Sequence, residues 1–345
     1  MRPFALVMLF LLIFVGSMIG QQSEFPLCSQ TMDWSQVMLT EDPLPETAQK
    51  FLIVSNRPYI PDAPDGELFP NEVSEFRKVS YLLAACDGDM WLLKELDGFT
   101  EGMKAIDNGR DILLFVHGHG KSMPAVLTRG FQIADRYDVS MILFDWPSFN
   151  SNFNKSLSRV RRCGVNYYNL LLQLQEYRSS NMQSGQHLSM LLHSLGNYFL
   201  THLVVNGNNQ YIEGKIFDNI IMNSAAIRSR EHGEVLSQIG MQENLYVIFN
   251  KNDKVLRGAH LLTAGKMLGN VVMEPLAKGA SYFDFTAVAG TQHTYFAGYH
   301  QFEFDLQVFE QVFDMAFHGG RVELAGSGLF SQKGDQPIWV VNDGQ

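Results

Sequence analysis

The feature of this 345-residue chain that most limits its fold is a series of six short runs rich in β-branched and aromatic residues. The runs span residues 112–116, 140–146, 187–192, 218–222, 245–250 and 282–288. Longer segments with helical periodicity alternate with them, at residues 121–137, 154–179, 196–206, 228–238, 257–269 and 303–317. Strands and helices that alternate in this order form a mostly parallel sheet flanked by helices on both faces. The sequence therefore predicts an α/β fold.

The rest of the chain sets the predicted domain boundaries. Residues 51–55 form a further apolar run that is typical of a strand, and the mixed apolar pattern of residues 74–95 also favours strands. Residues 21–50 show no clear periodicity and are interpreted as a linker or irregular arm. These observations predict one α/β domain over residues 51–325, followed by a C-terminal tail over residues 326–345.

Residues 1–20 have the layout of a secretory signal peptide. Arg2 precedes an apolar stretch over residues 4–19, and the chain turns polar at Gln21. The stretch is shorter than the roughly 20 residues that cross a bilayer, but it lacks a small-x-small cleavage site. Two alternatives therefore stand: export to the periplasm or the medium, or association with the membrane through an uncleaved anchor. Cys28 lies too far downstream to accept a lipid.

The charge of the chain argues against a nucleic-acid partner. Its 26 basic and 36 acidic residues give a formal net charge of −10, whereas binding to a phosphate backbone depends on clustered lysine and arginine. The one dense basic cluster consists of Arg159, Arg161 and Arg162, and its spacing is typical of a solvated helix face. We therefore expect no nucleic acid among the partners of this protein.

The cysteine content excludes a scaffold held together by several disulfides. The three cysteines, Cys28, Cys86 and Cys163, can form at most one disulfide within the chain, and the sequence leaves their pairing open. No CxxC motif or cysteine–histidine spacing typical of zinc is present, so the sequence predicts no metal site.

Polar residues follow the predicted strands at the carboxyl edge, where sheets of this kind bind their ligands. Ser194, Asp253 and His293 follow three different strands, in that order along the chain. A serine hydroxyl becomes a nucleophile when a base removes its proton, and the base needs a third group to orient it. The three residues are therefore the candidate nucleophile, acid and base.

Rival acids and bases occur elsewhere in the sequence. Asp145 precedes the serine and Asp284 falls within a predicted strand, so chain order favours Asp253. His293 follows the last predicted strand after a short loop, whereas His300 lies just before the final predicted helix, where a capping or packing role is favoured. Chain order thus selects one acid and one base, with the others as alternatives.

The residues around Ser194 resemble the nucleophile elbow, G-x-S-x-G, of the α/β-hydrolases, a sharp strand-to-helix turn that exposes the serine hydroxyl. The motif reads LHSLG here, so Leu192 stands where the first glycine is usual. Gly196 keeps the second glycine, which allows the following helix to pack close to the strand. The match to the elbow is therefore partial.

A second stretch, FVHGHG at residues 115–120, resembles the loop that completes the oxyanion hole in this superfamily. The resemblance implies that the backbone N–H groups of His119 and Leu195 bind the developing oxyanion. His117 is interpreted as a buried histidine that braces the loop. Trp146, Phe149 and Phe153, which follow a neighbouring strand, are candidates to line a substrate pocket, with core packing as the alternative.

These motifs, with SMILFDWPS, YVIFNKNDKVL and QHTYF, resemble over residues 111–317 a bacterial branch of the α/β-hydrolase superfamily whose members are mostly uncharacterised. The resemblance implies a serine hydrolase that cleaves a carboxylic ester, or a related acyl bond, through an acyl-enzyme intermediate. It implies a small-molecule or acyl substrate and no metal or organic cofactor. Two alternatives use the same fold: a non-catalytic binding protein at the cell envelope, and an acyltransferase with the same triad.

Overall fold

The computed structural model describes residues 33–61, 63, 66–75, 78–149, 151–263, 265–297, 306–322 and 328–341 of the chain. Its strands are β1 (Val37–Leu39), β2 (Lys50–Ser55), β3 (Ser80–Asp87), β4 (Met90–Leu96), β5 (Ile112–Val116), β6 (Ser140–Asp145), β7 (Leu188–His193), β8 (Phe217–Asn223), β9 (Gln242–Phe249), β10 (Ala280–Asp284), β11 (Phe330–Gln332) and β12 (Ile338–Val341). Its α-helices are α2 (Phe99–Ile106), α3 (Met123–Tyr137), α4 (Phe153–Ser180), α5 (Asn197–Val205), α6 (His232–Leu236), α7 (Lys254–Thr263) and α8 (Leu306–Phe317). Short 3₁₀ helices are η2 (Trp34–Gln36), η4 (Ser194–Gly196) and η5 (Asn208–Tyr211).

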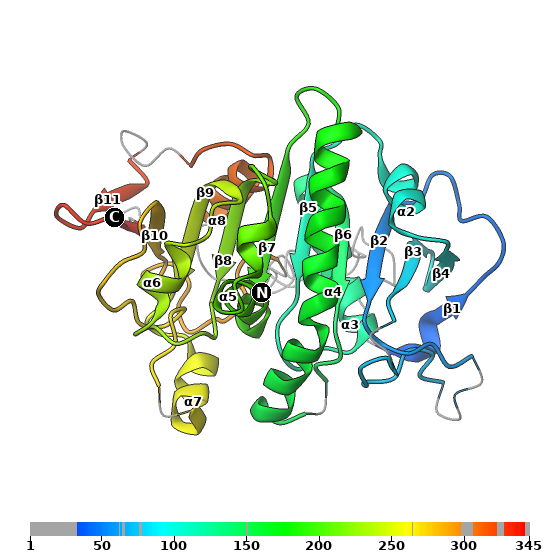
Figure 1. The fold of residues 1–345 in the computed structure, drawn as a ribbon, viewed down its shortest axis with the longest axis horizontal. Helices are drawn as coiled ribbons and strands as arrows, with labels where there is room; N and C mark the ends of the chain where they lie inside the picture. Colours follow the sequence, from blue (N-terminus) through cyan, green and yellow to red (C-terminus); the bar gives the residue numbers. More distant parts are fainter. Residues whose placement is uncertain are drawn as a thin grey trace, which may run out of the picture.

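All of the described strands belong to one sheet, in the order β1-β4-β3-β2-β6-β5-β7-β8-β9-β10-β12-β11 (Figure 1). From β2 to β12 in that order, every neighbouring pair is parallel. The hairpin of β3 and β4 and the last strand, β11, supply the antiparallel pairs. The predicted α/β class with a mostly parallel sheet is therefore confirmed, and each of the six predicted runs overlaps a strand.

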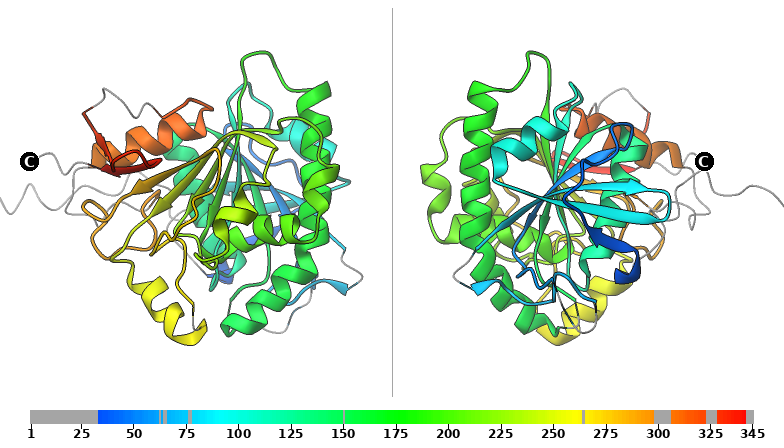
Figure 2. Two further views of the ribbon diagram at one scale, coloured as in Figure 1. Left: turned by 60° about the vertical axis from the view of Figure 1, so that its left-hand side comes forward. Right: turned by 90° about the vertical axis from the view of Figure 1, so that its right-hand side faces the viewer.

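Helices cover both faces of this sheet. In Figure 1, α4 and α5 lie in front of the strands, and α3 and α8 lie behind them. The right-hand view of Figure 2 shows α4 in green and α8 in orange on opposite sides of the twisted sheet. Because successive side chains of a strand point to opposite faces, Leu114 packs into one core and Phe115 into the other. Burial on both faces explains why the central strands are continuous apolar runs.

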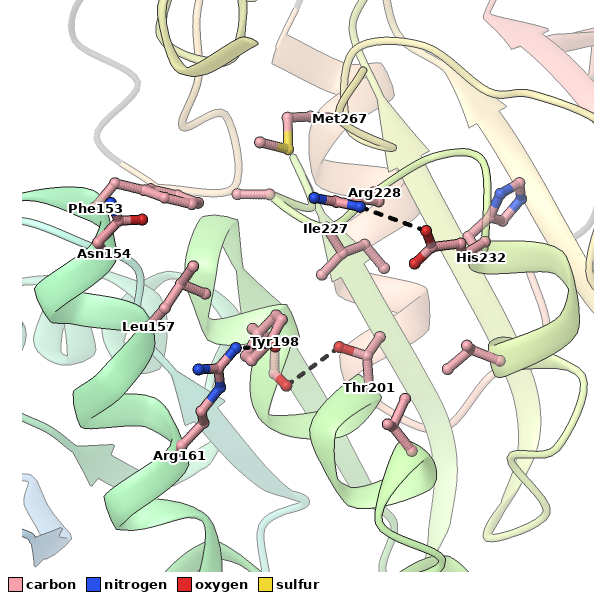
Figure 3. A pocket seen from close by; sticks show the side chains of 14 residues that line it. Phe153, Asn154, Leu157, Arg161, Tyr198, Thr201, Ile227, Arg228, His232 and Met267 are labelled. Carbon is pink, nitrogen blue, oxygen red and sulfur yellow. Dashed lines mark hydrogen bonds and ion pairs between the residues drawn. The ribbon is translucent and has the colours of Figure 1, made fainter. Parts of the chain in front are cut away.

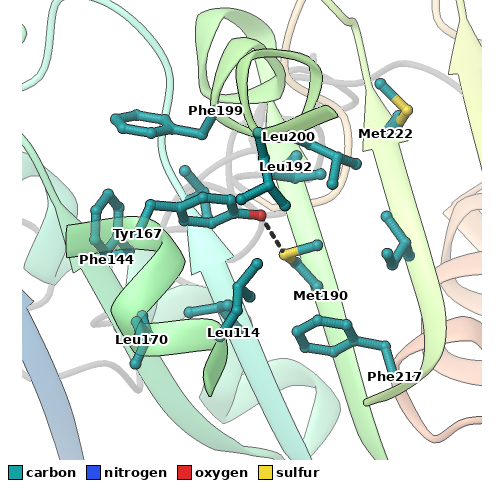
Figure 4. Packing of buried hydrophobic residues seen from close by; sticks show 14 of the residues in the cluster. Leu114, Phe144, Tyr167, Leu170, Met190, Leu192, Phe199, Leu200, Phe217 and Met222 are labelled. Carbon is teal, nitrogen blue, oxygen red and sulfur yellow. Dashed lines mark hydrogen bonds between the residues drawn. The ribbon is translucent and has the colours of Figure 1, made fainter. Parts of the chain in front are cut away.

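Large side chains in the core beneath α4 hold the helices against the central strands (Figure 4). The Tyr167 ring of α4 meets the Phe144 ring of β6 edge-on, with 5.5 Å between centroids. The same tyrosine lies 5.4 Å from the Phe199 ring of α5 and donates its hydroxyl to Met190 Sδ at 3.2 Å. These contacts position α5 and, through it, the turn that precedes it.

The sheet extends beyond the predicted domain at both ends. β1 lies within the predicted linker, residues 21–50, and pairs with β4. β12 and β11 lie within the predicted tail, residues 326–345, and extend the sheet from β10. These strands are three or four residues long, which is too short for a periodicity of their own. They form because the sheet offers them an edge with which to pair. The sequence also did not predict α2.

The basic cluster of α4 differs from the predicted solvated face at one position. The Arg159 side chain is buried, and its guanidinium donates to the carbonyl oxygens of Pro147 at 3.3 Å and Asn71 at 2.5 Å. Arg161 and Arg162 are exposed, as predicted. The periodicity of charged residues does not reveal this difference, because the carbonyls that bond Arg159 come from distant loops.

Residues 1–20, the predicted signal peptide or anchor, lie outside the described residues, as does Cys28. In the part of the chain that the structure describes, no helix combines the length and the apolarity needed to cross a membrane. Cys86 is disulfide-bonded. Cys163 is a free, buried cysteine, and burial raises the pKa of its thiol to about 12.

Candidate active site

Ser194 lies on the turn between β7 and α5, in a backbone conformation that is unusual for a residue with a side chain. Its φ is 53°, in the left-handed region, and residues other than glycine are held there only when the surrounding structure imposes it. Two bonds to its carbonyl oxygen impose it: Asn197 Nδ2 donates at 2.9 Å and the Ala226 N–H donates at 3.0 Å. The turn therefore holds the candidate nucleophile in a strained conformation.

Glycines allow two other segments to approach this turn closely. A Cβ atom at Gly196 would lie 2.6 Å from the carbonyl oxygen of Val116, so only glycine fits there. A Cβ at Gly118 would lie 2.8 Å from Ser194 Cβ. Leu192, which replaces the first glycine of the elbow, is fully buried in the core. The elbow thus forms with a leucine at this position because the core accommodates its side chain.

Asp253 and His293 are brought together from separate loops. His293 Nδ1 donates to Asp253 Oδ2 at 2.6 Å. The other carboxylate oxygen, Oδ1, accepts the N–H groups of Val255 and Leu256 at 2.9 and 3.0 Å, at the start of α7. The Asp253 carboxylate is completely buried, whereas the imidazole of His293 keeps some exposed surface. The acid is thus fixed by the helix it precedes, and its bond to Nδ1 leaves His293 Nε2 available as a base.

The rival acids are engaged elsewhere. Asp145 forms a buried ion pair with Arg57, with 2.8 Å between Arg57 Nε and Asp145 Oδ2. Asp284 pairs with Lys251. His300, the rival base, lies outside the described residues. Among the described carboxylates, Asp253 is the one that contacts His293.

Two polar side chains that the sequence analysis did not single out hold the loop of His293. Ser224 follows β8, and its hydroxyl donates to the His293 carbonyl oxygen at 2.8 Å. Its φ is 46°, so it is a second strained serine beside the site. Asn250 follows β9, and its side-chain amide donates to the carbonyl oxygens of Gly290 and Gln292 at 3.1 and 3.0 Å. In the sequence, the one feature that indicates a role for Ser224 and Asn250 is that each directly follows a parallel strand.

His193 links the nucleophile turn to the His293 loop. Its Nδ1 donates to Asn223 Oδ1 at 3.1 Å, and its Nε2 accepts from the Thr294 hydroxyl at 3.2 Å. The rings of His193 and His293 lie 4.8 Å apart. Burial, followed by the neighbouring His293, holds the pKa of His193 well below its usual value, so this ring is neutral near pH 7.

The contact between base and nucleophile is looser than that between base and acid. The described residues include no hydrogen bond between Ser194 Oγ and His293. The ring of His193, the residue before Ser194, lies next to the ring of His293. Hydrogen bonds of this kind are often long in unliganded sites and tighten when the substrate binds. The structure therefore joins Asp253 to His293 directly and places both beside the Ser194 turn.

The predicted oxyanion-hole residues flank the same turn. Leu195 is buried directly after Ser194, and His119 lies on the loop that Gly118 brings against the turn. The His119 N–H is not among the described backbone donors that pair in turns, loops and caps, and Leu195 is the second residue of η4, where an N–H has no partner within its own helix. The side chain of His119 is engaged elsewhere: its Nδ1 shares a hydrogen bond of 2.8 Å with Ser156 Oγ. Both amides are therefore available to an incoming oxygen.

A buried ion pair supports the loop that carries His119. Arg57 donates to the carbonyl oxygens of Lys121 and Trp146, both at 3.1 Å, and to the Asp145 carboxylate. The Arg57 guanidinium outweighs the effect of burial and lowers the pKa of Asp145 well below its usual value. His117 accepts the N–H of Trp146 at 3.1 Å, which is the bracing role inferred for it. Arg57 is a supporting residue that the sequence analysis did not identify.

In the described part of the chain, Trp146 and Phe149, both predicted to line a substrate pocket, do not line a common cavity. Trp146 is fully buried, stacked 5.4 Å from His117 and packed against Phe199, so it has no surface for a substrate in this structure. Phe149 is half-buried and does not line the cavity between α4 and α5. Phe153, four residues further along, does line that cavity. The apolar environment of Trp146 explains its position, because core packing is the more common fate of a tryptophan beside a buried strand.

The chain is similar to two solved structures and matches one protein family. The chain is similar to a solved structure titled "Structure of arylesterase", at 9% identity and a TM-score of 0.38, over 91% of this chain and 98% of the other. It is also similar to MGS-M1, an alpha/beta hydrolase enzyme from a Medee basin deep-sea metagenome library, at 11% identity and a TM-score of 0.30, over 63% and 79% of the two chains. These likenesses are too distant to bear on function. No curated protein matches the sequence. A family described as "Alpha/beta hydrolase of unknown function (DUF900)" matches residues 98–302, which is more than half of the chain, and the protein therefore belongs to this α/β-hydrolase family.

Proposed function

We propose that this protein is a serine hydrolase that cleaves a carboxylic ester through a triad of Ser194, His293 and Asp253. The observation that carries the proposal is the 2.6 Å hydrogen bond from His293 Nδ1 to the buried Asp253 carboxylate, beside a serine on a strained strand-to-helix turn. A buried acid that bonds one ring nitrogen fixes the tautomer whose other nitrogen accepts a proton. A structural ion pair alone does not require the strained serine next to it.

In the first half of the reaction, Ser194 Oγ attacks the carbonyl carbon of the ester while His293 Nε2 takes the serine proton. The electron pair of the C=O bond moves to oxygen, and the N–H groups of His119 and Leu195 stabilise the resulting negative charge. The tetrahedral intermediate then re-forms the C=O bond and breaks the bond to the leaving alkoxide. His293 returns its proton to that alkoxide, and the acyl group remains on Ser194.

In the second half, water replaces the alcohol. His293 Nε2 removes a proton from the water as its oxygen attacks the acyl carbon, and the same two N–H groups stabilise the oxyanion. When the intermediate breaks down, Ser194 Oγ leaves and takes the proton from His293. Throughout the cycle, the Asp253 carboxylate stabilises the positive charge that forms on the imidazole. An acyltransferase would differ only in accepting an alcohol or amine in place of this water.

The test is labelling by a fluorophosphonate probe, which reacts with activated serines whatever their natural substrate. We expect the wild-type protein to be labelled at Ser194, as mapped by peptide mass spectrometry, and Ser194→Ala to abolish the labelling without loss of folding. Ser224 is the internal comparison, because it is also strained and also lies at a strand end. An adduct on Ser224, or no adduct on any serine, would refute the proposal, and the second result would favour the non-catalytic binding protein.

We also propose that the chain is exported, on the evidence of the apolar N-terminal segment over residues 4–19. Cell fractionation tests this: processed protein outside the cytoplasm supports a cleaved signal peptide, and full-length protein in the membrane fraction supports an anchor. Full-length protein in the cytosol would contradict both.

A further inference from the structure

A cavity lies between α4, α5 and the segment that follows β8 (Figure 3). Its volume is about 490 Å³, within the range of small-molecule sites. Much of its wall is apolar, with Phe153 and Leu157 on α4, Ile227 after β8, and Val235 on α6. We refer to it as the α4–α5 pocket.

One end of this pocket adjoins the nucleophile turn. Ala226 lines the pocket, and its N–H donates to the Ser194 carbonyl oxygen at 3.0 Å. Tyr198 and Thr201, which line the floor, lie on α5, the helix that begins just after Ser194. The triad residues themselves are not part of the lining. The pocket and the nucleophile turn therefore adjoin each other at Ala226.

The polar groups of the pocket favour an anion. Arg161 and Arg228 extend toward it from opposite sides (Figure 3). The Arg161 guanidinium contacts the Tyr198 hydroxyl at 3.4 Å, and no carboxylate pairs with it among the described residues. Glu231, the one acidic residue of the lining, faces Arg228 at 3.6 Å. The lining thus carries an excess of positive charge on a chain whose net charge is −10. The guanidinium of Arg161, which has no carboxylate partner among the described residues, lies beside these apolar walls and matches an amphipathic carboxylate.

We propose that the α4–α5 pocket binds the apolar, anion-bearing part of the substrate, so that the protein acts on esters in which an alkyl chain carries a free carboxylate. The proposal rests on the serine hydrolase function given above, because it places the ester at the Ala226 end, next to Ser194. The alkyl chain then lies on Leu157, Ile227 and Val235, and the carboxylate meets the arginines.

Binding of dodecanoate to the Ser194→Ala variant, measured by calorimetry, tests the charge recognition. We expect saturable binding that weakens about tenfold or more in Arg161→Gln/Arg228→Gln, because the bound carboxylate loses its charge-assisted hydrogen bonds to the guanidinium groups. The matched control is Arg162→Gln/Arg230→Gln, which removes the same charge from exposed neighbours that do not line the pocket. An equal loss in both double variants would show a non-specific charge effect and overturn the proposal. Absence of binding to the Ser194→Ala parent would overturn it as well.

Competition with the fluorophosphonate probe tests whether the pocket serves the reacting serine. We expect dodecanoate to slow the labelling of wild-type Ser194. We expect no slowing in Val235→Trp, whose indole fills the pocket, and normal slowing in Met38→Trp, an exposed position on β1. Dodecanoate that binds without slowing the labelling, or that slows it equally in Val235→Trp, would refute a substrate role. If wild-type protein takes no label at all, the proposed function fails, whereas the calorimetric result still reports on the pocket.

Discussion

Under the proposed function, His293 carries the proton, and the acid, the base and the nucleophile are expected to act as one unit. Removal of the base by His293→Ala is expected to lower kcat by about 10⁴–10⁶-fold, and Asp253→Asn by about 10⁴-fold, because the amide favours the wrong tautomer of the ring. KM should change little, since both residues act mainly in the transition state. Steady-state kinetics on a chromogenic ester measure these changes in kcat and KM. The double variant His293→Ala/Asp253→Asn is the check, because additive losses in it would show that the two residues do not act together.

His193 is expected to position the base without taking part in proton transfer. It bonds Asn223 and Thr294 on either side of the site, so His193→Phe removes both bonds and frees the loop that carries His293. We expect kcat to fall about ten- to hundredfold with KM nearly unchanged. His193→Gln keeps a donor and an acceptor and should recover most of the activity. If glutamine is as damaging as phenylalanine, the hydrogen bonds are not what matters.

The buried pair of Arg57 and Asp145 is expected to contribute to stability in a pH-dependent way. Arg57→Met leaves an uncompensated buried carboxylate and should lower the free energy of unfolding by about 3–5 kcal/mol at pH 7. Because the folded pKa of Asp145 is lowered, its contribution is fully present above its ordinary pKa of 3.8 and is lost as the pH falls through the folded value. Urea unfolding at pH 7 and below pH 4 measures it. If the difference in unfolding free energy between the wild-type protein and Arg57→Met grows as the pH falls, the predicted direction of the pH dependence is wrong.

At the scale of elements, the close contact between β5 and the β7–α5 turn decides whether the site forms. Gly196→Ala would place a Cβ 2.6 Å from the Val116 carbonyl oxygen, so one backbone segment must move. We expect a loss of about 1–3 kcal/mol in unfolding free energy and a marked loss of probe labelling. Gly240→Ala is the control, since a Cβ there meets no atom within 4 Å, and its effect should stay within about 0.5 kcal/mol. Equal effects at both positions would mean that close approach is not the cause.

At the scale of the whole molecule, the last strands close one edge of the sheet. β12 pairs with β10, and Phe330 of β11 packs 5.4 Å from Phe283. A chain truncated after residue 325 would expose that edge, together with apolar surface worth about 1.5–3 kcal/mol for each large side chain. We expect a lower thermal midpoint and increased light scattering relative to the full chain. An unchanged midpoint would show that these strands are not integral to the fold.

Short-range patterns in the sequence determined the central part of this protein. The run around Leu114 is apolar at every position because both faces are covered, and that signal lies within five consecutive residues. The turn at Ser194 is equally local, since a serine followed by Leu195 and Gly196 after an apolar run indicates a strand-to-helix turn. The chain order of Ser194, Asp253 and His293 followed from the same reasoning.

Only the tertiary structure decided the features that join residues distant in the chain. The outer strands, such as β1, are too short to carry a pattern and exist through pairing with the sheet. Arg57 and Asp145 are 88 residues apart, and Thr294 and His193 are 101 apart, so no window of sequence shows that they bond. Trp146 was a candidate pocket residue until its neighbours were known. Hydrophobic periodicity reports which face of an element is buried, but not what buries it, and the α4–α5 pocket exists only where three such elements meet.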